Sequence, residues 1–309
     1  MAEIAIGAAV GEGFSLIRRR PGVVVTWGLA QVLVTAAAML LFAPFFLHTF
    51  GDALRQARGG GAPQTPPDLQ NIVRMQSMSY LVNLVSLFAN SIIYCAVFRA
   101  VLHPEQGRFG YLRVGAPELF LFVLIIGGYI ALMVGAVVAA IPIVIVAVIL
   151  AGVHAVPAAV ILGIVAGIAA FVVMAYLILR VSLVGPMMVD DGKFHLTEAW
   201  ALTRGKVASL LAVGLVLLVV LIAVEMIIAL VLIALGFGVV GSLAGGLRNL
   251  PVFFQQPTQV LLPKLAPLLA VAAVAWVPVA GALLAIMGAP WARAYRDLRP
   301  KGDISETFV

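Results

Sequence analysis

The stretch that decides the fold reads LFLFVLIIGGYIALMVGAVVAAIPIVIVAVILAGVHAVPAAVILGIVAGIAAFVVMAYLIL, residues 119–179, and it contains no Asp, Glu, Lys or Arg. As one helix it would measure about 90 Å at about 1.5 Å per residue. The hydrocarbon core of a bilayer is only about 30 Å thick. The stretch is therefore predicted to cross a membrane twice and to reverse between Gly152 and Pro157, because glycine and proline favour a tight turn there.

The rest of the chain has the same character. Of its 309 residues, 63% are hydrophobic and 10% are charged, whereas a soluble domain carries roughly 25% charged residues. We therefore predict an all-α, polytopic membrane protein with six transmembrane helices in a single membrane domain, residues 1–309. The expected spans are 22–48, 77–102, 118–150, 157–184, 207–235 and 265–292.

One short pattern precedes three of the apolar runs, which predicts three helical hairpins built as repeats. The hairpins would cover residues 1 to about 104, about 105 to 190, and about 191 to 309. The three copies of the pattern read Phe14-x-Leu16-x-Arg18, Phe109-x-Tyr111-x-Arg113 and Trp200-x-Leu202-x-Arg204.

The basic residues gather on one side of the predicted spans. Lys and Arg total 19 against 13 Asp and Glu, a formal net charge of +6, and fourteen of the 19 fall in connections on the side of the amino terminus. The positive-inside rule then places both termini in the cytoplasm, in a bacterial cytoplasmic membrane. A nucleic-acid partner is not expected, because the charges flank apolar runs and form no basic stripe on a soluble domain.

Two segments are predicted to be amphipathic helices along the inner membrane surface, residues 2–19 and 194–206. In the first, Ile6, Val10, Phe14 and Ile17 recur at helical spacing. These segments and the pattern copies hold residues that could serve as ordinary interfacial anchors or bind specific lipid headgroups, and both interpretations stay open. The candidate interfacial residues are Phe14, Arg18, Phe109, Arg113, Trp200, Arg204 and Lys206.

Glu225 is the charged residue that lies well inside a predicted span. A carboxylate in lipid costs on the order of 3 kcal/mol even on lenient insertion scales. We therefore expect Glu225 to face other helices, where Asn83 and Asn90 of the second span offer a polar stripe. An interhelical hydrogen bond that fixes packing and an ion or proton pathway are both consistent with this pattern.

The side chains that carry metal or redox chemistry are scarce. Cys95 is the single cysteine, and the four histidines are scattered one per region, without the spacing of a metal site. No metal, cofactor or catalytic residue is predicted, and an intramembrane enzyme is the least favoured function because no nucleophile and base pair is visible.

The segments Arg180-Val-Ser-Leu and Glu198-Ala-Trp200-x-Leu202-Thr-Arg204-Gly205-Lys206 lead into an apolar span. This arrangement resembles the membrane domain associated with some bacterial glycerophosphoryl diester phosphodiesterases, and related six-span proteins of unknown function. In that family hydrolysis belongs to a separate soluble barrel with paired histidine and carboxylate metal ligands. The chain has no His-Arg-Gly motif, so the resemblance implies a membrane domain and no enzymatic activity.

The expected function is a non-catalytic membrane scaffold or lipid-associated accessory protein. Its expected partners are membrane lipids, with a membrane protein or a second copy of the chain as further candidates. The alternative is a transporter or channel for a small or lipid-like substrate, organised around Glu225.

Overall fold

The computed structural model describes residues 4–57, 69–152, 155–249, 253, 256 and 258–299. These residues form helices and turns, with no strand among them. In this part of the chain six helices are long and apolar enough to cross a membrane. The predicted all-α fold with six such helices is confirmed, and it is compatible with a multi-pass membrane protein.

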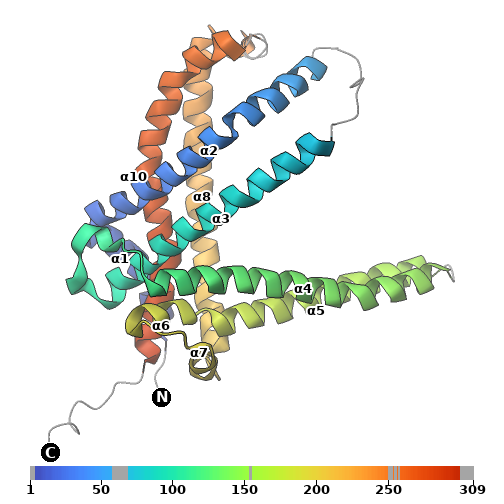
Figure 1. Cartoon of the computed structure of the whole chain (residues 1–309), viewed down its shortest axis with the longest axis vertical. Coiled ribbons are helices and arrows are strands. Elements are labelled where there is room, and N and C mark those ends of the chain that lie inside the picture. Colours follow the sequence, from blue (N-terminus) through green and yellow to red (C-terminus); the bar gives the residue numbers. More distant parts are fainter. Residues whose placement is uncertain are drawn as a thin grey trace, which may run out of the picture. The chain divides into compact units, whose positions relative to one another are not determined.

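The six long helices are α2, α3, α4, α5, α8 and α10, and along the chain the shorter helices precede or connect them (Figure 1). The α-helices span Ile6–Arg19 (α1), Pro21–Ala57 (α2), Leu69–Leu102 (α3), Ala116–Gly152 (α4), Val156–Val181 (α5), Val184–Asp191 (α6), Leu196–Leu202 (α7), Val207–Leu243 (α8) and Thr258–Leu298 (α10). Three short 3-10 helices span Pro104–Gln106 (η1), Arg108–Tyr111 (η2) and Leu247–Asn249 (η3).

Helix α8 is longer than the sequence pattern predicts. It continues past residue 235 through three glycines and ends only at Leu243. Glycine is tolerated in a membrane-spanning helix, and no proline or charged residue occurs between residues 235 and 243. The helix stops before Gly245 and Gly246, whose φ angles of 72° and 126° leave the helical region.

The chain divides into two compact units, and each is described by itself. Unit 1 comprises Met1–Glu12, Tyr94–Gly214 and Gly288–Val309, and unit 2 comprises Gly13–Ile93 and Leu215–Met287. This division does not follow the predicted limits of the hairpins near residues 104 and 190.

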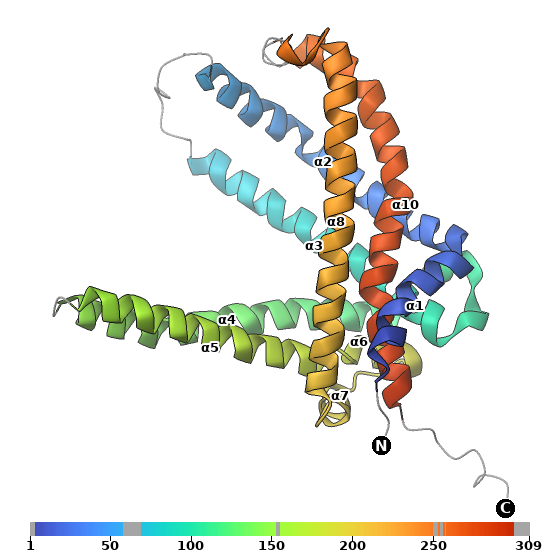
Figure 2. The same cartoon turned by 180° about the vertical axis from the view of Figure 1, so that it is seen from behind.

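In unit 1, α4 and α5 lie side by side as an antiparallel hairpin (Figures 1 and 2). The reversal predicted between Gly152 and Pro157 is confirmed, since α4 ends at Gly152 and α5 begins at Val156. Helix α6 contacts α4, and α7 contacts α5. Because every residue from Val184 to Val189 is buried, α6 is a core element of this unit.

In unit 2, helices α2 and α10 touch through their backbones. A Cβ atom added to Gly28 would lie 1.8 Å from the Val277 carbonyl oxygen, and one added to Gly281 would lie 2.0 Å from the Val24 carbonyl oxygen. Trp27 beside this crossing is fully buried. Small residues at a crossing allow two helices to pack closely. In a membrane this close packing favours association, because the lipid tails are as apolar as the helices and the hydrophobic effect does not drive the helices together.

The outward surface of the long helices is apolar. Phe171 on α5 is 73% exposed and Val219 on α8 is 66% exposed, and neighbouring Ile, Leu and Val side chains are similarly open. Such a continuous apolar surface would be unfavourable in water, whereas lipid hydrocarbon matches it.

Candidate functional site

An arginine stands near the carboxyl end of the second helix of each predicted hairpin. These are Arg99 on α3, Arg180 on α5 and Arg293 on α10, and all three belong to unit 1. Each contacts a segment that precedes another long helix, and we call the three sets of contacts the Arg99, Arg180 and Arg293 junctions.

The Arg99 junction is a buried ion pair. Arg99 Nη2 pairs with Glu118 Oε1 at the start of α4, and Arg99 Nη1 donates a hydrogen bond to the Tyr111 carbonyl oxygen at 3.3 Å. The Glu118 side chain is fully buried and that of Arg99 is 9% exposed. Phe109, Gly110 and Tyr111 have φ angles of 50°, 65° and 64°. This left-handed turn is strained for the two non-glycine residues, and it places the Tyr111 carbonyl against Arg99.

The Arg293 junction ties the first helix to the last one. Arg293 Nη1 lies 3.3 Å from Glu12 Oε2, and Arg293 Nε lies 3.1 Å from Asp297 Oδ1. Arg296 adds a contact of 3.6 Å to the same oxygen of Glu12 and donates a hydrogen bond to the Val101 carbonyl oxygen at 3.3 Å. Both cationic side chains therefore face carboxylates.

The Arg180 junction is built differently. Arg180 Nη1 donates hydrogen bonds to the Trp200 carbonyl oxygen at 2.8 Å and to Thr203 Oγ1 at 3.2 Å. Its guanidinium carbon lies 4.4 Å from the centroid of the Trp200 ring and 5.6 Å from that of Tyr176, within the range of a cation–π interaction. Arg180 is only 7% exposed. Aromatic faces and neutral oxygens thus surround this charge.

The ion pairs formed by the described residues do not include Arg180. Its Nε is buried without a hydrogen-bond partner. The same is true of Arg293 Nε, but that nitrogen lies 3.1 Å from the Asp297 carboxylate, whereas Arg180 has no such counter-charge among the described residues. A buried charge without a counter-charge costs several kcal/mol after relaxation, and cation–π contacts offset about 2 kcal/mol when desolvated. The Arg180 junction is therefore electrostatically incomplete, in contrast to the other two.

A second cluster surrounds Asp190 at the end of α6. Tyr295 donates its hydroxyl hydrogen to Asp190 Oδ2 at 2.9 Å, Arg299 Nη1 lies 2.9 Å from the same oxygen, and His103 Nε2 lies 3.2 Å from Oδ1. Gly192, with φ of 74°, then ends α6 and donates its N–H to the Met188 carbonyl oxygen at 2.9 Å. The buried carboxylate holds α6 to the ends of α3 and α10.

Acidic groups in unit 1 thus serve mainly as partners of basic ones. His195 continues this arrangement, lying 3.0 Å from Asp191 Oδ2 and 2.9 Å from Glu198 Oε2. Among the described residues no group of three His, Cys, Asp or Glu could hold a metal ion. Cys95 is buried. This chemistry suits the fixing of helix ends and the binding of an anion.

The side chains of the interfacial residues predicted from the sequence are mostly exposed. The aromatic side chains of Phe14, Phe109 and Trp200 are 46%, 88% and 38% exposed. Arg18, Arg113 and Arg204 are exposed and Lys206 is half-buried. Arg113 Nη2 donates a hydrogen bond to the Gln106 carbonyl oxygen at 3.3 Å. Of this set, Trp200 is the residue that stacks on a junction arginine.

The three copies of the sequence pattern differ in conformation. The copy at 14–18 lies within α1, the copy at 109–113 includes the left-handed turn, and the copy at 200–204 begins in α7 and ends in a turn. The repeat therefore stays a prediction, as does the placement of α1 and α7 on a membrane surface.

The structure places Glu225 on the exposed surface of α8. Asn83 is exposed and donates a hydrogen bond to Ser79 Oγ at 3.5 Å, one turn away on α3, and Asn90 is half-buried. Among the described residues no hydrogen bond joins Glu225 to either asparagine, and the role expected of Glu225 stays a prediction.

Sequence reasoning used Arg99, Arg180 and Arg293 only to orient the spans and missed their contacts. A signal did exist, because each is a charged residue near the end of an apolar run. Their partners could not be chosen from it, since the pair Glu12 and Arg293 is separated by 281 positions in the chain.

Comparisons of the chain with protein-family models, with curated proteins and with solved structures give no match. The resemblance to the membrane domain of bacterial glycerophosphoryl diester phosphodiesterases therefore stays a prediction. The fold and the junctions define the class, an all-α protein with six helices in its described part that are suited to a membrane.

Proposed function

We propose that this chain is a non-catalytic integral membrane protein of the bacterial cytoplasmic membrane, a scaffold or lipid-associated accessory protein with both termini in the cytoplasm. The observation that carries the proposal is the order in which the three junctions connect the predicted hairpins. Arg99 reaches the segment that opens the second predicted hairpin, and Arg180 reaches the segment that opens the third. Arg293 reaches Glu12 in the segment that opens the first.

This order supports three hairpin repeats in which a junction joins each repeat to the next, and the last to the first. Each hairpin ends on an arginine that binds the beginning of the next. Charged groups engaged in such contacts hold helices in place, and removal of one partner of a buried ion pair destabilises the folded protein. The arrangement suits a rigid platform better than a reaction centre that must bind and release a substrate.

The junctions and the Asp190 cluster also support the proposed orientation. Their charged members lie in connections that the positive-inside rule assigns to the amino-terminal side. The residues concerned are Glu12, Arg99, Glu118, Arg180, Asp190, Arg293, Arg296 and Arg299. Contacts among them in unit 1 are those expected of helix ends that share one compartment.

Extraction of the protein in native lipid particles, followed by mass spectrometry of the lipids and proteins retained, tests the proposal. A lipid-associated scaffold retains a lipid composition different from the bulk membrane, together with a protein neighbour or a second copy in a fixed ratio. A matched pair of variants makes the test specific. Glu118→Gln weakens the buried Arg99 junction, whereas Glu105→Gln changes a side chain that is 65% exposed.

We expect the retained set to be lost or reduced in Glu118→Gln and unchanged in Glu105→Gln. Retention of bulk lipid alone, with no neighbour and no second copy, would contradict the proposal.

The second candidate function is transport of a small or lipid-like substrate, and Glu225 favours it. An exposed carboxylate on an otherwise apolar helix is costly in lipid, and a function in transport accounts for its presence. In proteoliposomes, a transporter shows a pH-dependent flux that Glu225→Gln abolishes and Glu198→Gln leaves intact. Equal flux through all three proteins decides against a role of Glu225 in transport, and no flux through the wild type decides against transport itself.

A further inference from the structure

The three junctions are alike in their arginine and unlike in their counter-charge. Arg99 faces Glu118, and Arg293 faces Glu12 and Asp297. Arg180 is buried to a similar degree, and its described contacts are with neutral oxygens and aromatic rings. A carboxylate of the protein faces the arginine at the Arg99 and Arg293 junctions. Because the described residues place none at the Arg180 junction, an external anion can occupy the corresponding position there.

The unused part of the Arg180 guanidinium has a definite shape. Nη1 is engaged by Trp200 and Thr203, whereas Nε has no partner and no bond to Nη2 is found among the described residues. The Nε and Nη2 hydrogens form the fork that binds two oxygens of one carboxylate or phosphate in parallel. The hydrogen bonds on Nη1 keep this fork in one orientation.

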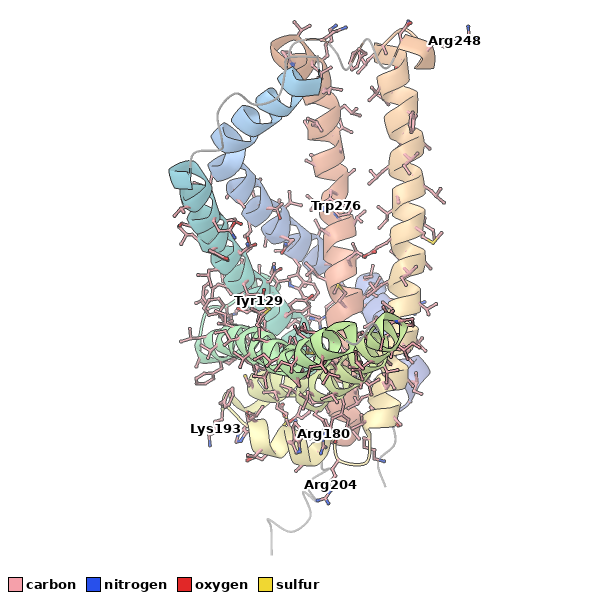
Figure 3. All side chains as sticks on the ribbon, turned by 90° about the vertical axis from the view of Figure 1, so that its right-hand side faces the viewer. Tyr129, Arg180, Lys193, Arg204, Arg248 and Trp276 are labelled. Atoms are coloured by element: carbon pink, nitrogen blue, oxygen red, sulfur yellow. The ribbon has the colours of Figure 1, made fainter. Side chains whose placement is uncertain are left out.

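The nearest acidic side chains in the sequence are already engaged, beginning with Asp190, which pairs with Arg299 and His103. Glu198, on the same short helix as Trp200, lies 2.9 Å from His195 Nδ1, and Asp191 lies 3.0 Å from His195 Nε2. Arg204 and Lys206 follow Thr203 directly and add positive charge. Figure 3 shows Arg180, Lys193 and Arg204 on the same side of the α4–α5 hairpin.

The aromatic side chains point to where the anion comes from. Trp200 and Tyr176 stack on Arg180 and yet remain 38% and 43% exposed. Tryptophan and tyrosine with this combination are typical of the headgroup level of a membrane, where lipid phosphates are the most abundant anions.

We propose that the Arg180 junction is a phosphate-binding site, in which the free fork of Arg180 holds two phosphate oxygens, with Arg204 and Lys206 as supporting charges. The phosphate is that of an anionic lipid headgroup or a free phosphate. The site rests on the proposed lipid-associated function and gives it one location and one ligand chemistry.

The test uses the full chain in phosphatidylcholine nanodiscs that contain a small fraction of phosphatidylglycerol, with native mass spectrometry to count the phosphatidylglycerol retained. A second arm adds inorganic phosphate to the protein in pure phosphatidylcholine and follows the midpoint of thermal unfolding. The variants are Arg180→Lys, which keeps the charge and loses the fork, Trp200→Phe, and the control Arg113→Gln at an exposed arginine of another pattern copy.

We expect Arg180→Lys to retain phosphatidylglycerol at least about tenfold more weakly, since a hydrogen bond to a charged group is worth at least about as much as the free energy of a tenfold change in affinity. Arg113→Gln should stay within about twofold of the wild type on the same scale. If the free ion is the natural ligand, inorganic phosphate raises the unfolding midpoint of the wild type and not that of Arg180→Lys. Circular dichroism confirms that each variant is folded, and Trp200→Phe, which keeps every hydrogen bond of Arg180, should weaken retention less than Arg180→Lys.

The site is overturned if the wild type responds to neither phosphatidylglycerol nor inorganic phosphate, or if Arg180→Lys and Arg113→Gln respond as the wild type does. The second result, with lipid still enriched, removes the site and leaves the lipid-associated function standing. Absence of any enriched lipid or protein in native particles removes both.

Discussion

Replacement of Gly28 by alanine should separate α2 from α10 and destabilise unit 2. The added Cβ would lie 1.8 Å from the Val277 carbonyl oxygen and 2.8 Å from the Gly281 nitrogen. Carbon and carbonyl oxygen approach comfortably only to about 3.3 Å, so the two backbones must move apart by roughly 1.5 Å at this crossing. Both close atoms belong to backbone, and no side-chain rotation can relieve the clash.

Overpacking of this kind typically costs about 1–3 kcal/mol, occasionally more. Because both helices must shift here, we expect a loss of about 3 kcal/mol in the free energy of unfolding of Gly28→Ala. The matched control is Gly163→Ala on α5, where an added Cβ meets nothing within 4 Å. It should be neutral or up to about 1 kcal/mol more stable, since alanine favours a helix over glycine.

Denaturant unfolding of the detergent-solubilised protein, followed by the fluorescence of Trp27 and the other tryptophans, measures both variants. Gly281→Ala should behave as Gly28→Ala does, because its Cβ would lie 2.0 Å from the Val24 carbonyl oxygen. If Gly28→Ala and Gly163→Ala unfold at the same denaturant concentration, the backbone contact between α2 and α10 is wrong.

Three further predictions concern unit 1 and the membrane orientation. Arg99→Met should cost about 3–5 kcal/mol because it strands the buried Glu118, and adding Glu118→Met should recover much of that loss; strictly additive losses in the double-mutant cycle would refute the ion pair. Asp190→Asn should cost about 1–3 kcal/mol in thermal unfolding through its lost bonds to Arg299, Tyr295 and His103, against less than about 1 kcal/mol for Asp191→Asn, whose side chain is 43% exposed; equal losses would contradict the Asp190 cluster. Cysteines introduced at Lys193 and Arg248 should react with a membrane-impermeant reagent from the cytoplasmic and the outer side respectively, and labelling of both from one side would refute the orientation.

The number and approximate limits of the long helices could be predicted from the sequence. Charge-free apolar runs of more than about 18 residues can form few structures other than membrane-spanning helices. The turn before Pro157 can be predicted from the glycine and proline beside it. The prediction was less accurate at the end of α2 and the start of α3, which lie at Ala57 and Leu69 where residues 48 and 77 were expected. It was also less accurate at the end of α8, where glycines inside an apolar run read as a loop and the structure continues the helix to Leu243. Local composition does not show whether neighbouring glycines will keep or leave helical φ angles.

The candidate site was only partly accessible to sequence reasoning. Trp200, Arg204 and Lys206 were singled out as interfacial residues, and Trp200 does stack on an arginine. Arg180 itself, the buried charge that organises the site, looked like one more flanking cation. Its distinction is the missing carboxylate, which becomes visible only when the partners of Arg99 and Arg293 are known.

That this chain is helical, apolar and long enough to form six helices suited to a membrane could be predicted from the amino-acid sequence, because these properties depend on residues close together along the chain. Tertiary structure alone decided which glycines touch, which arginines meet a carboxylate and which one does not. Contacts such as Gly28 with Gly281 and Glu12 with Arg293 join residues more than 250 positions apart. Side-chain type does not choose among such distant partners; the packing of the folded helices does.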